Sequence, residues 1–161
     1  MSEQVEDDAL DRQEPEKKLT AKHLRVAAMN ILARREHSRK EVGDKLHKKL
    51  CPDSELLNTV LDQLVADDLL SDQRFSEAFV RWRVGKGQGP IRIRAELRER
   101  GVDGDVVLRQ SEVDWFVLAQ EVAHKRFGEL PAVDIKQRAK RMRFLQYRGF
   151  NGEQIRAALG E

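Results

Sequence analysis

The octapeptide RGVDGDVV at residues 100–107 returns as RGFNGEQI at residues 148–155, 48 positions later. In both copies an arginine and a glycine are followed by an apolar residue, then by Asp or Asn, a second glycine and an acidic residue. A glycine after a helical run is typical of a helix C-terminus, and Asp or Asn before an acidic residue is typical of the next N-terminus. Each copy therefore predicts a tight turn between two helices, and the recurrence predicts a repeated helical unit.

The helical pattern extends along most of the chain. Apolar residues recur at helical spacing, and no stretch shows the period of two that a strand needs. Thr20 predicts one helix start, Ser38 and Glu41 have capping-box spacing at a second, and Ser71 or Asp72 predicts a later one. We predict an all-α protein whose nine helices form three tandem three-helix repeats.

The first repeat matches the other two less closely. A shift of 51 residues places Leu46 and Leu56 on Leu97 and Val107, but it puts Leu50 where the later repeats have glycine. The predicted domains are an acidic tail and three repeats, over residues 1–18, 19–68, 69–112 and 113–161.

Charge is distributed unevenly between the tail and the repeats. Residues 1–16 hold seven acids and one base, so they carry −6, and the other 145 residues carry +8 because the whole chain is +2. The tail is expected to be disordered and solubilising, or to shield the basic body. The basic body is expected to face a polyanion.

The stretch GKGQGP at residues 85–90 raises the question of a nucleotide site. A phosphate-binding loop or a dinucleotide fingerprint needs a different glycine spacing and a preceding strand, whereas the residues before Gly85 read as a helix. Pro90 suits the first position of a helix. We therefore predict that these glycines form a turn between two helices of the middle repeat, with no nucleotide or other cofactor.

Residues for catalysis or metal binding are also lacking as a set. The four histidines are scattered, and His47 and Cys51 alone share i, i+4 spacing, which is too few ligands for a zinc site. A single cysteine fits a reducing cytosol, and no apolar run approaches the length of a membrane span. We expect a cytoplasmic protein that is not an enzyme, in which Trp82 and Trp115 are core residues.

Two basic clusters are the main candidates for a binding surface. Residues 81–101 hold seven bases against two acids, and residues 136–148 hold six bases and no acid. Helical spacing places part of the second cluster on one stripe, and the repeat alignment puts Lys140 on Arg92. The candidate residues for partner binding are Arg81, Arg83, Lys86, Arg92, Arg94, Arg98, Lys136, Lys140, Arg143 and Tyr147.

Two kinds of partner remain open from the residues alone. Phosphate or an acidic protein surface would satisfy the clusters equally. The three-helix units are also compatible with helix-turn-helix modules that compete for DNA, although helices rich in Arg and Lys favour phosphate contacts over base readout.

The middle unit, residues 69–102, closely resembles the RecX family of regulators of the RecA recombinase. The S-R-K-E run at 38–41 and the ending FLQYRGFNGEQIRAAL resemble the flanking units of that family. The residues that carry the resemblance are Asp72, Phe75, Phe79, Val80, Arg83, Gly89, Pro90, Arg92, Ile93, Glu96, Leu97, Gly101 and Val102.

The resemblance implies a curved, elongated array of three-helix repeats without enzymatic activity. It implies binding to RecA filaments on single-stranded DNA. We expect a monomer that contacts the DNA either directly or through the filament. It also implies inhibition of ATP hydrolysis, strand exchange, co-protease activity and filament extension, by lying in the filament groove or by blocking the filament end.

Overall fold

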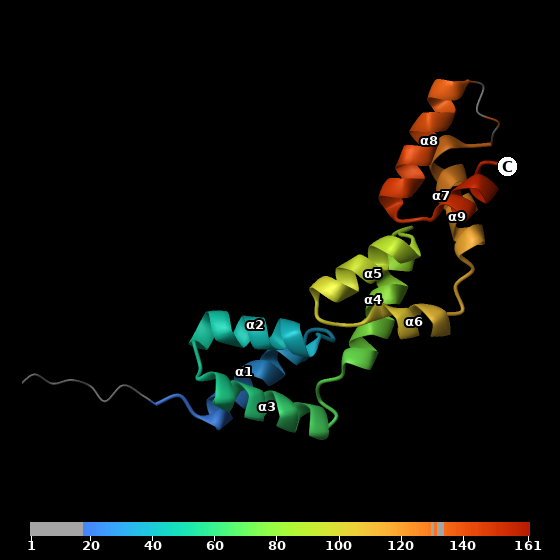
Figure 1. The fold of residues 1–161 in the computed structure, drawn as a ribbon. Coiled ribbons are helices and arrows are strands. Elements are labelled where there is room, and N and C mark those ends of the chain that lie inside the picture. Colours follow the sequence, from blue (N-terminus) through green and yellow to red (C-terminus); the bar gives the residue numbers. More distant parts are fainter. Residues whose placement is uncertain (1–17, 130, 132–133) are drawn as a thin grey trace, which may run out of the picture.

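The computed structural model describes residues 18–129, 131 and 134–161, so the predicted acidic tail lies outside the described residues except for Lys18. Within the described part the chain forms nine helices and no strand (Figure 1). They are α1 (Ala21–Leu32), α2 (Arg39–Leu50), α3 (Ser54–Ala66), α4 (Asp72–Gly85), α5 (Pro90–Glu99), α6 (Gly104–Gln110), α7 (Trp115–Phe127), α8 (Ile135–Arg148) and α9 (Gly152–Ala158).

The helices group in threes, and each group has its own apolar core. Leu24, Leu46 and Leu64 are fully buried in the first core. Ile93 and Leu97 occupy the second, and Leu145 with Phe150 the third. In each group the first and third helices pack together and the second lies against them. The prediction of three tandem three-helix repeats is confirmed.

The predicted N-caps are present at the start of these helices. The side chains of Thr20 and Ser38 accept hydrogen bonds from backbone amides in the first turns of α1 and α2, and each forms a capping box. Of the two candidates for α4, Ser71 is the cap, with its Oγ accepting from the Arg74 amide. The Asp72 carboxylate instead accepts from the Arg39 amide at 2.7 Å, which ties the first two repeats together.

The repeated octapeptide forms the predicted turn twice. Gly101 and Gly149 have φ values of 76° and 98°, in the left-handed region that favours glycine. Asp103 and Asn151 then cap α6 and α9. Both turns are therefore built from the same two devices, a left-handed glycine and a polar N-cap.

The first repeat has the same turn with a different residue at its centre. Cys51 takes the left-handed conformation, with φ of 43°, and Asp53 caps α3 two residues later. The alignment that placed Leu50 at the glycine position is therefore wrong by one residue. Leucine spacing set that alignment, whereas the turn itself is fixed by the cap and the left-handed residue.

Neighbouring repeats join through the ends of their second helices. The amides of Gly89 and Ile91 donate to the carbonyls of Arg148 and Gly149 at 2.8 and 3.0 Å, so the start of α5 rests on the end of α8. The Ser38 hydroxyl donates to the Arg100 carbonyl at 2.7 Å, which places the start of α2 on the end of α5.

The three second helices thus lie end to end along one side of the molecule (Figure 1). The array is elongated and bent, with the first repeat at one end and the third repeat at the other. The predicted elongated, curved array is confirmed. The glycines at 85–90 form the predicted turn between α4 and α5, and Gly89 also contacts the third repeat.

Candidate partner-binding surface

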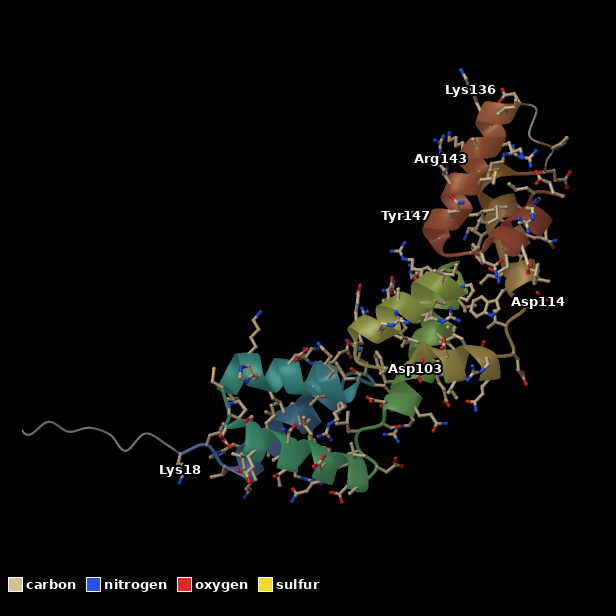
Figure 2. All side chains as sticks on the ribbon, viewed as in Figure 1. Lys18, Asp103, Asp114, Lys136, Arg143 and Tyr147 are labelled. Atoms are coloured by element: carbon tan, nitrogen blue, oxygen red, sulfur yellow. The ribbon has the colours of Figure 1, made fainter. Side chains whose placement is uncertain are left out.

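The stripe predicted on α8 is present and open to solvent. Lys136, Lys140 and Arg143 are exposed, and within the described residues none of them pairs with a carboxylate. Tyr147 continues the stripe with 75% of its surface exposed. Figure 2 shows Lys136, Arg143 and Tyr147 along α8. Such a stripe lowers the stability of an isolated helix through charge repulsion, and an external anion would relieve that repulsion.

Arg92 extends the stripe across the junction between the second and third repeats. Its guanidinium lies 5.2 Å from the centre of the Tyr147 ring and donates to the Tyr147 carbonyl at 3.4 Å. A hydrogen bond to Glu96 raises the pKa of Arg92 above its ordinary value. Arg92 is therefore a permanent cation at the end of the α8 stripe, held in place by groups from two repeats.

Other arginines of the first cluster are held by acids within the same repeat. Glu96 pairs with Arg83 at 2.6 Å and with Arg92 at 3.0 Å, and the Glu96 and Arg83 side chains are only 15% and 17% exposed. Arg94 pairs with Asp105 of α6 at 2.6 Å. These ion pairs leave the first cluster with less free charge than its composition indicated. The sequence gives the number of acids and bases but not which of them pair.

The remaining candidates lie apart from the α8 stripe. Arg98 shares a shallow pocket with Arg94 and the turn at 101–105, on the side of α5 that meets α6. Arg81 is exposed near the end of α4 and Lys86 just after it, and neither has an ion-pair partner in the part of the chain that the structure describes. The structure therefore groups Lys136, Lys140, Arg143, Tyr147 and Arg92 and places the other five elsewhere.

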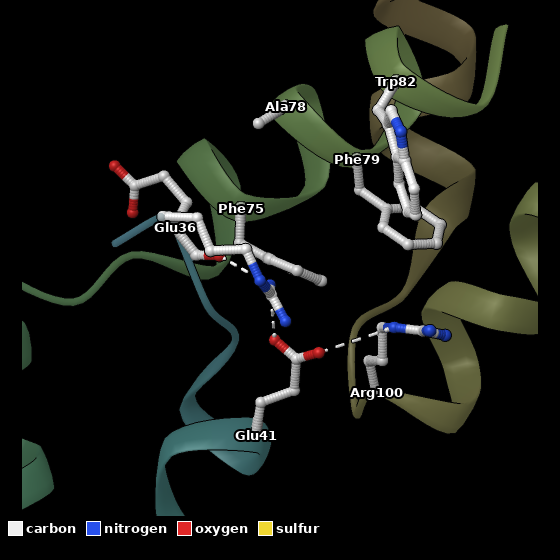
Figure 3. Close-up of a pocket in the computed structure, with 8 residues that line it drawn as sticks. Glu36, Glu41, Phe75, Ala78, Phe79, Trp82 and Arg100 are labelled. Atoms are coloured by element: carbon white, nitrogen blue, oxygen red, sulfur yellow. Dashed lines mark hydrogen bonds and ion pairs between the residues drawn. The ribbon is translucent and has the colours of Figure 1, made fainter. Parts of the chain in front are cut away.

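A pocket between the first and second repeats was not predicted. It has a volume of about 460 Å³ and an aromatic wall formed by Phe75, Phe79 and Trp82 (Figure 3). Arg35 and Arg100 contact Glu41 at its rim, at 3.4 and 3.5 Å, so the rim charges largely neutralise one another.

Trp82 contradicts the prediction that it is a core residue, because 53% of its surface is exposed. The ring is nevertheless held. The Arg83 guanidinium stacks 4.2 Å from its centre, and the Phe79 ring packs edge-on at 5.9 Å. Trp115, by contrast, packs against the core of the second repeat as predicted. Helical spacing alone placed Trp82 inward. Its position lies at the junction with the first repeat, which does not cover the Trp82 ring.

The described residues show neither a metal site nor a membrane span. They contain no group of three or more His, Cys, Asp or Glu side chains placed to hold a metal ion. None of the helices in residues 18–129 and 134–161 has the length and apolar character needed to cross a membrane.

Comparison with known proteins identifies the family. The models of the first, second and third three-helix domains of RecX match residues 25–64, 71–108 and 112–159. Regulatory protein RecX of Halorhodospira halophila is 46% identical over 138 residues, covering 84% of this chain and 85% of that protein. Regulatory protein RecX of Pseudomonas entomophila is 47% identical over 135 residues, covering 82% and 86%.

A solved structure shows the same fold. The crystal structure of RecX from Lactobacillus salivarius superimposes with a TM-score of 0.72 at 22% identity, covering 86% of this chain and 94% of that one. Three domain models in sequence order, relatives well above 40% identity and a shared fold all agree. The chain therefore belongs to the RecX family, a family of non-enzymatic regulatory proteins.

Proposed function

We propose that this protein is a negative regulator of the RecA recombinase that binds RecA filaments on single-stranded DNA. Bound in this way, it inhibits ATP hydrolysis, strand exchange, co-protease activity and filament extension. Membership of the RecX family supports the partner, and the unpaired cationic stripe of α8 is the observation that carries the mode of binding.

The length of the array suits a filament as partner. The second helices hold 14, 10 and 12 residues, and at 1.5 Å per residue they make roughly 50 Å of helix laid end to end. That length exceeds the diameter of a small domain, about 30 Å. We therefore expect one molecule to contact more than one subunit of a filament.

The candidate cations divide into two roles in this proposal. Lys136, Lys140 and Arg143 have no carboxylate partner among the described residues, so binding an anion costs them no existing ion pair. Arg83 and Arg94 already hold carboxylates and maintain the repeat itself. We therefore assign the first three to direct contact with the filament. Tyr147 and Arg92 join them because they lie at the end of the same stripe, although Arg92 also holds the Glu96 carboxylate.

The test is RecA ATPase on preformed single-strand filaments, with this protein added well below one molecule per RecA. Wild-type protein should inhibit strongly. A triple charge reversal, Lys136→Glu with Lys140→Glu and Arg143→Glu, should weaken inhibition at least about tenfold, since each 1.4 kcal/mol of lost binding is a factor of ten. Full inhibition by the folded triple variant would exclude the α8 stripe as the binding surface.

A matched control applies the same charge change elsewhere. Lys22, Arg109 and Arg156 are exposed on α1, α6 and α9. Reversing all three to Glu alters net charge equally but leaves the second helices intact, so inhibition should stay within about twofold of wild type.

Competition for DNA is the other mechanism that the α8 stripe permits. Binding through phosphates weakens steeply as salt rises, because each neutralised phosphate releases counterions. Naked single-stranded DNA binding should therefore be titrated beside the ATPase assay from low to moderate salt. Inhibition that persists where DNA affinity has collapsed supports the filament, and inhibition that falls in parallel with DNA affinity supports competition.

A further inference from the structure

We propose that the pocket between residues 84–87, α7 and α8 binds an acidic peptide segment that also carries apolar side chains. The segment belongs to the protein that this chain regulates, so the proposal rests on the proposed function. The pocket is separate from the α8 stripe and from the aromatic pocket of Figure 3, and Lys86 alone among its lining residues was predicted from the sequence as a binding residue.

The floor of this pocket is apolar. Its volume is about 710 Å³, and Val84, Leu118, Val122 and Phe144 line it from three different helices. An apolar hollow of this size at the surface favours the burial of one or two aliphatic side chains from a partner.

The rim of the pocket is cationic. Lys86, Lys125, Arg126 and Arg148 line it, and Glu121 is the acidic residue among its described lining. Lys86, Lys125 and Arg126 are exposed and have no ion-pair partner in the described part of the chain. An apolar floor under a cationic rim is complementary to a segment that alternates apolar and acidic residues.

The walls of the pocket are held in place before any partner arrives. Arg148 donates from Nη1 to the Lys86 carbonyl at 2.8 Å, which fixes the end of α4 against the end of α8. A Cβ on Gly87 would approach Val122 to 2.9 Å, so residue 87 sits directly on α7. A preformed pocket loses little entropy on binding.

A nucleic acid fits this pocket less well than a peptide. Stacking of a base needs an open aromatic face. Phe144, the aromatic residue in the lining, is covered by the Phe127 ring, edge-on at 5.3 Å, and by the Arg148 guanidinium at 5.1 Å. The floor therefore offers aliphatic contact and no stacking platform.

Gly85 provides a position from which to test the occupant. It is exposed, it lines the pocket, and a Cβ built on it meets nothing within 4 Å. A Gly85→Cys variant in a Cys51→Ser background carries one thiol, which a benzophenone maleimide labels. The labelled protein is mixed with RecA filaments on single-stranded DNA, sedimented, irradiated and digested for mass spectrometry. The matched control carries the label at Asn58→Cys, exposed on α3 of the first repeat.

The proposal expects cross-linking from position 85 to a RecA peptide rich in Asp and Glu, and not from position 58. Cross-linking of position 85 to DNA, or none from a protein that still sediments with filaments, overturns the pocket but leaves the proposed function standing. Failure of the wild-type protein to sediment with filaments overturns both.

Charge reversal supplies a second, independent measurement. Lys125→Glu with Arg126→Glu should raise the Kd for filaments about tenfold, because both rim cations then repel the acidic segment. Arg109→Glu with Arg156→Glu is the matched control and should change Kd less than about twofold. Equal Kd values for the two folded variants would contradict the proposal.

Discussion

The backbone amide of Gly89 donates a 2.8 Å hydrogen bond to the carbonyl oxygen of Arg148, across the junction of the second and third repeats. The first amides of any helix and its last carbonyls lack partners inside that helix. Here the start of α5 and the end of α8 supply partners for each other. The junction therefore depends on a close backbone approach, which side-chain packing alone does not provide.

Gly89→Ala should destabilise this junction. The residue has φ of −85° and ψ of 169°, which any amino acid adopts, but a Cβ would lie 2.5 Å from the carbonyl carbon and oxygen of Gly149. Backbone atoms cannot yield as a flexible side chain does, so we expect a loss of about 1–3 kcal/mol in unfolding free energy. Urea denaturation followed by far-UV circular dichroism measures it.

Gly85→Ala is the control for that substitution. Gly85 is the last residue of α4 and has open space around it, so alanine should be neutral or should stabilise by about 0.5–1 kcal/mol. Equal stability of the two variants would show that the α5–α8 contact is looser than the hydrogen bond indicates.

Cys51→Gly should stabilise the first repeat. Cys51 is exposed and has a left-handed backbone, a conformation that costs a residue with a Cβ about 1–2 kcal/mol. Glycine avoids that cost, but ordering its more flexible backbone on folding costs about 0.5–1 kcal/mol more. We expect a net gain of about 0.5–1 kcal/mol in the same denaturation measurement. Cys51→Ala removes the thiol but keeps the Cβ, so it should leave stability unchanged. A gain from alanine equal to that from glycine would show that the thiol, and not the backbone, sets the effect.

The turn around Cys51 also shows how far sequence reasoning reaches. The turns at Gly101 and Gly149 can be predicted because glycine is the usual left-handed residue at the end of a helix. N-caps such as Asp103 can be predicted because Asp, Asn, Ser and Thr are preferred there. Cys51 gives no such signal, so the first repeat was aligned one residue off. Local chemistry that follows general rules was predictable, and the exceptional residue was not.

The binding surface was predicted less completely than the fold, for a different physical reason. Sequence places charges on helices but does not show which charges meet across space. Glu96 neutralises two of the predicted arginines, and Trp82 is exposed because a neighbouring repeat leaves its face open. Both facts depend on contacts between elements, which periodicity within one helix does not specify.

Glu96→Gln should destabilise the second repeat by about 2 kcal/mol. It removes the charge that holds both Arg83 and Arg92, and Arg83 is largely buried against it. Removing one partner of a well-buried pair costs about 3–5 kcal/mol, and partial exposure reduces that figure here. Thermal or urea unfolding measures the loss.

Glu99→Gln provides the comparison for Glu96. Glu99 is exposed on α5 and forms no ion pair within the described chain. The unfolding free energy of the Glu99→Gln variant should therefore stay within about 0.5 kcal/mol of wild type. If Glu96→Gln behaves in the same way, the Arg83 pair contributes nothing to the repeat.

His37 should make the stability of the first junction depend on pH. Its side chain is 2% exposed beside Ser38, the residue that contacts the second repeat. Nε2 lies 2.9 Å from the Lys45 ammonium and Nδ1 lies 2.9 Å from the Arg35 carbonyl. An ammonium only donates, so Nε2 accepts from Lys45 and Nδ1–H donates to Arg35. The neutral ring therefore satisfies both neighbours, and a protonated ring faces a cation.

The pKa of His37 is accordingly lowered below its ordinary value of 6.5, chiefly by burial and further by the charges of Arg35 and Lys45, with the Arg35 carbonyl and Glu41 opposing. Since the unfolded chain binds the proton more readily, stability is complete above pH 6.5 and falls as pH decreases below it. The slope reaches at most about 1.4 kcal/mol per pH unit for one proton.

Urea unfolding between pH 7.5 and 5 measures this slope. His37→Gln should be less stable at pH 7.5 yet lose this slope, whereas His47→Gln, at an exposed position of α2, should keep it. Identical slopes in both variants would assign the pH dependence to groups other than His37.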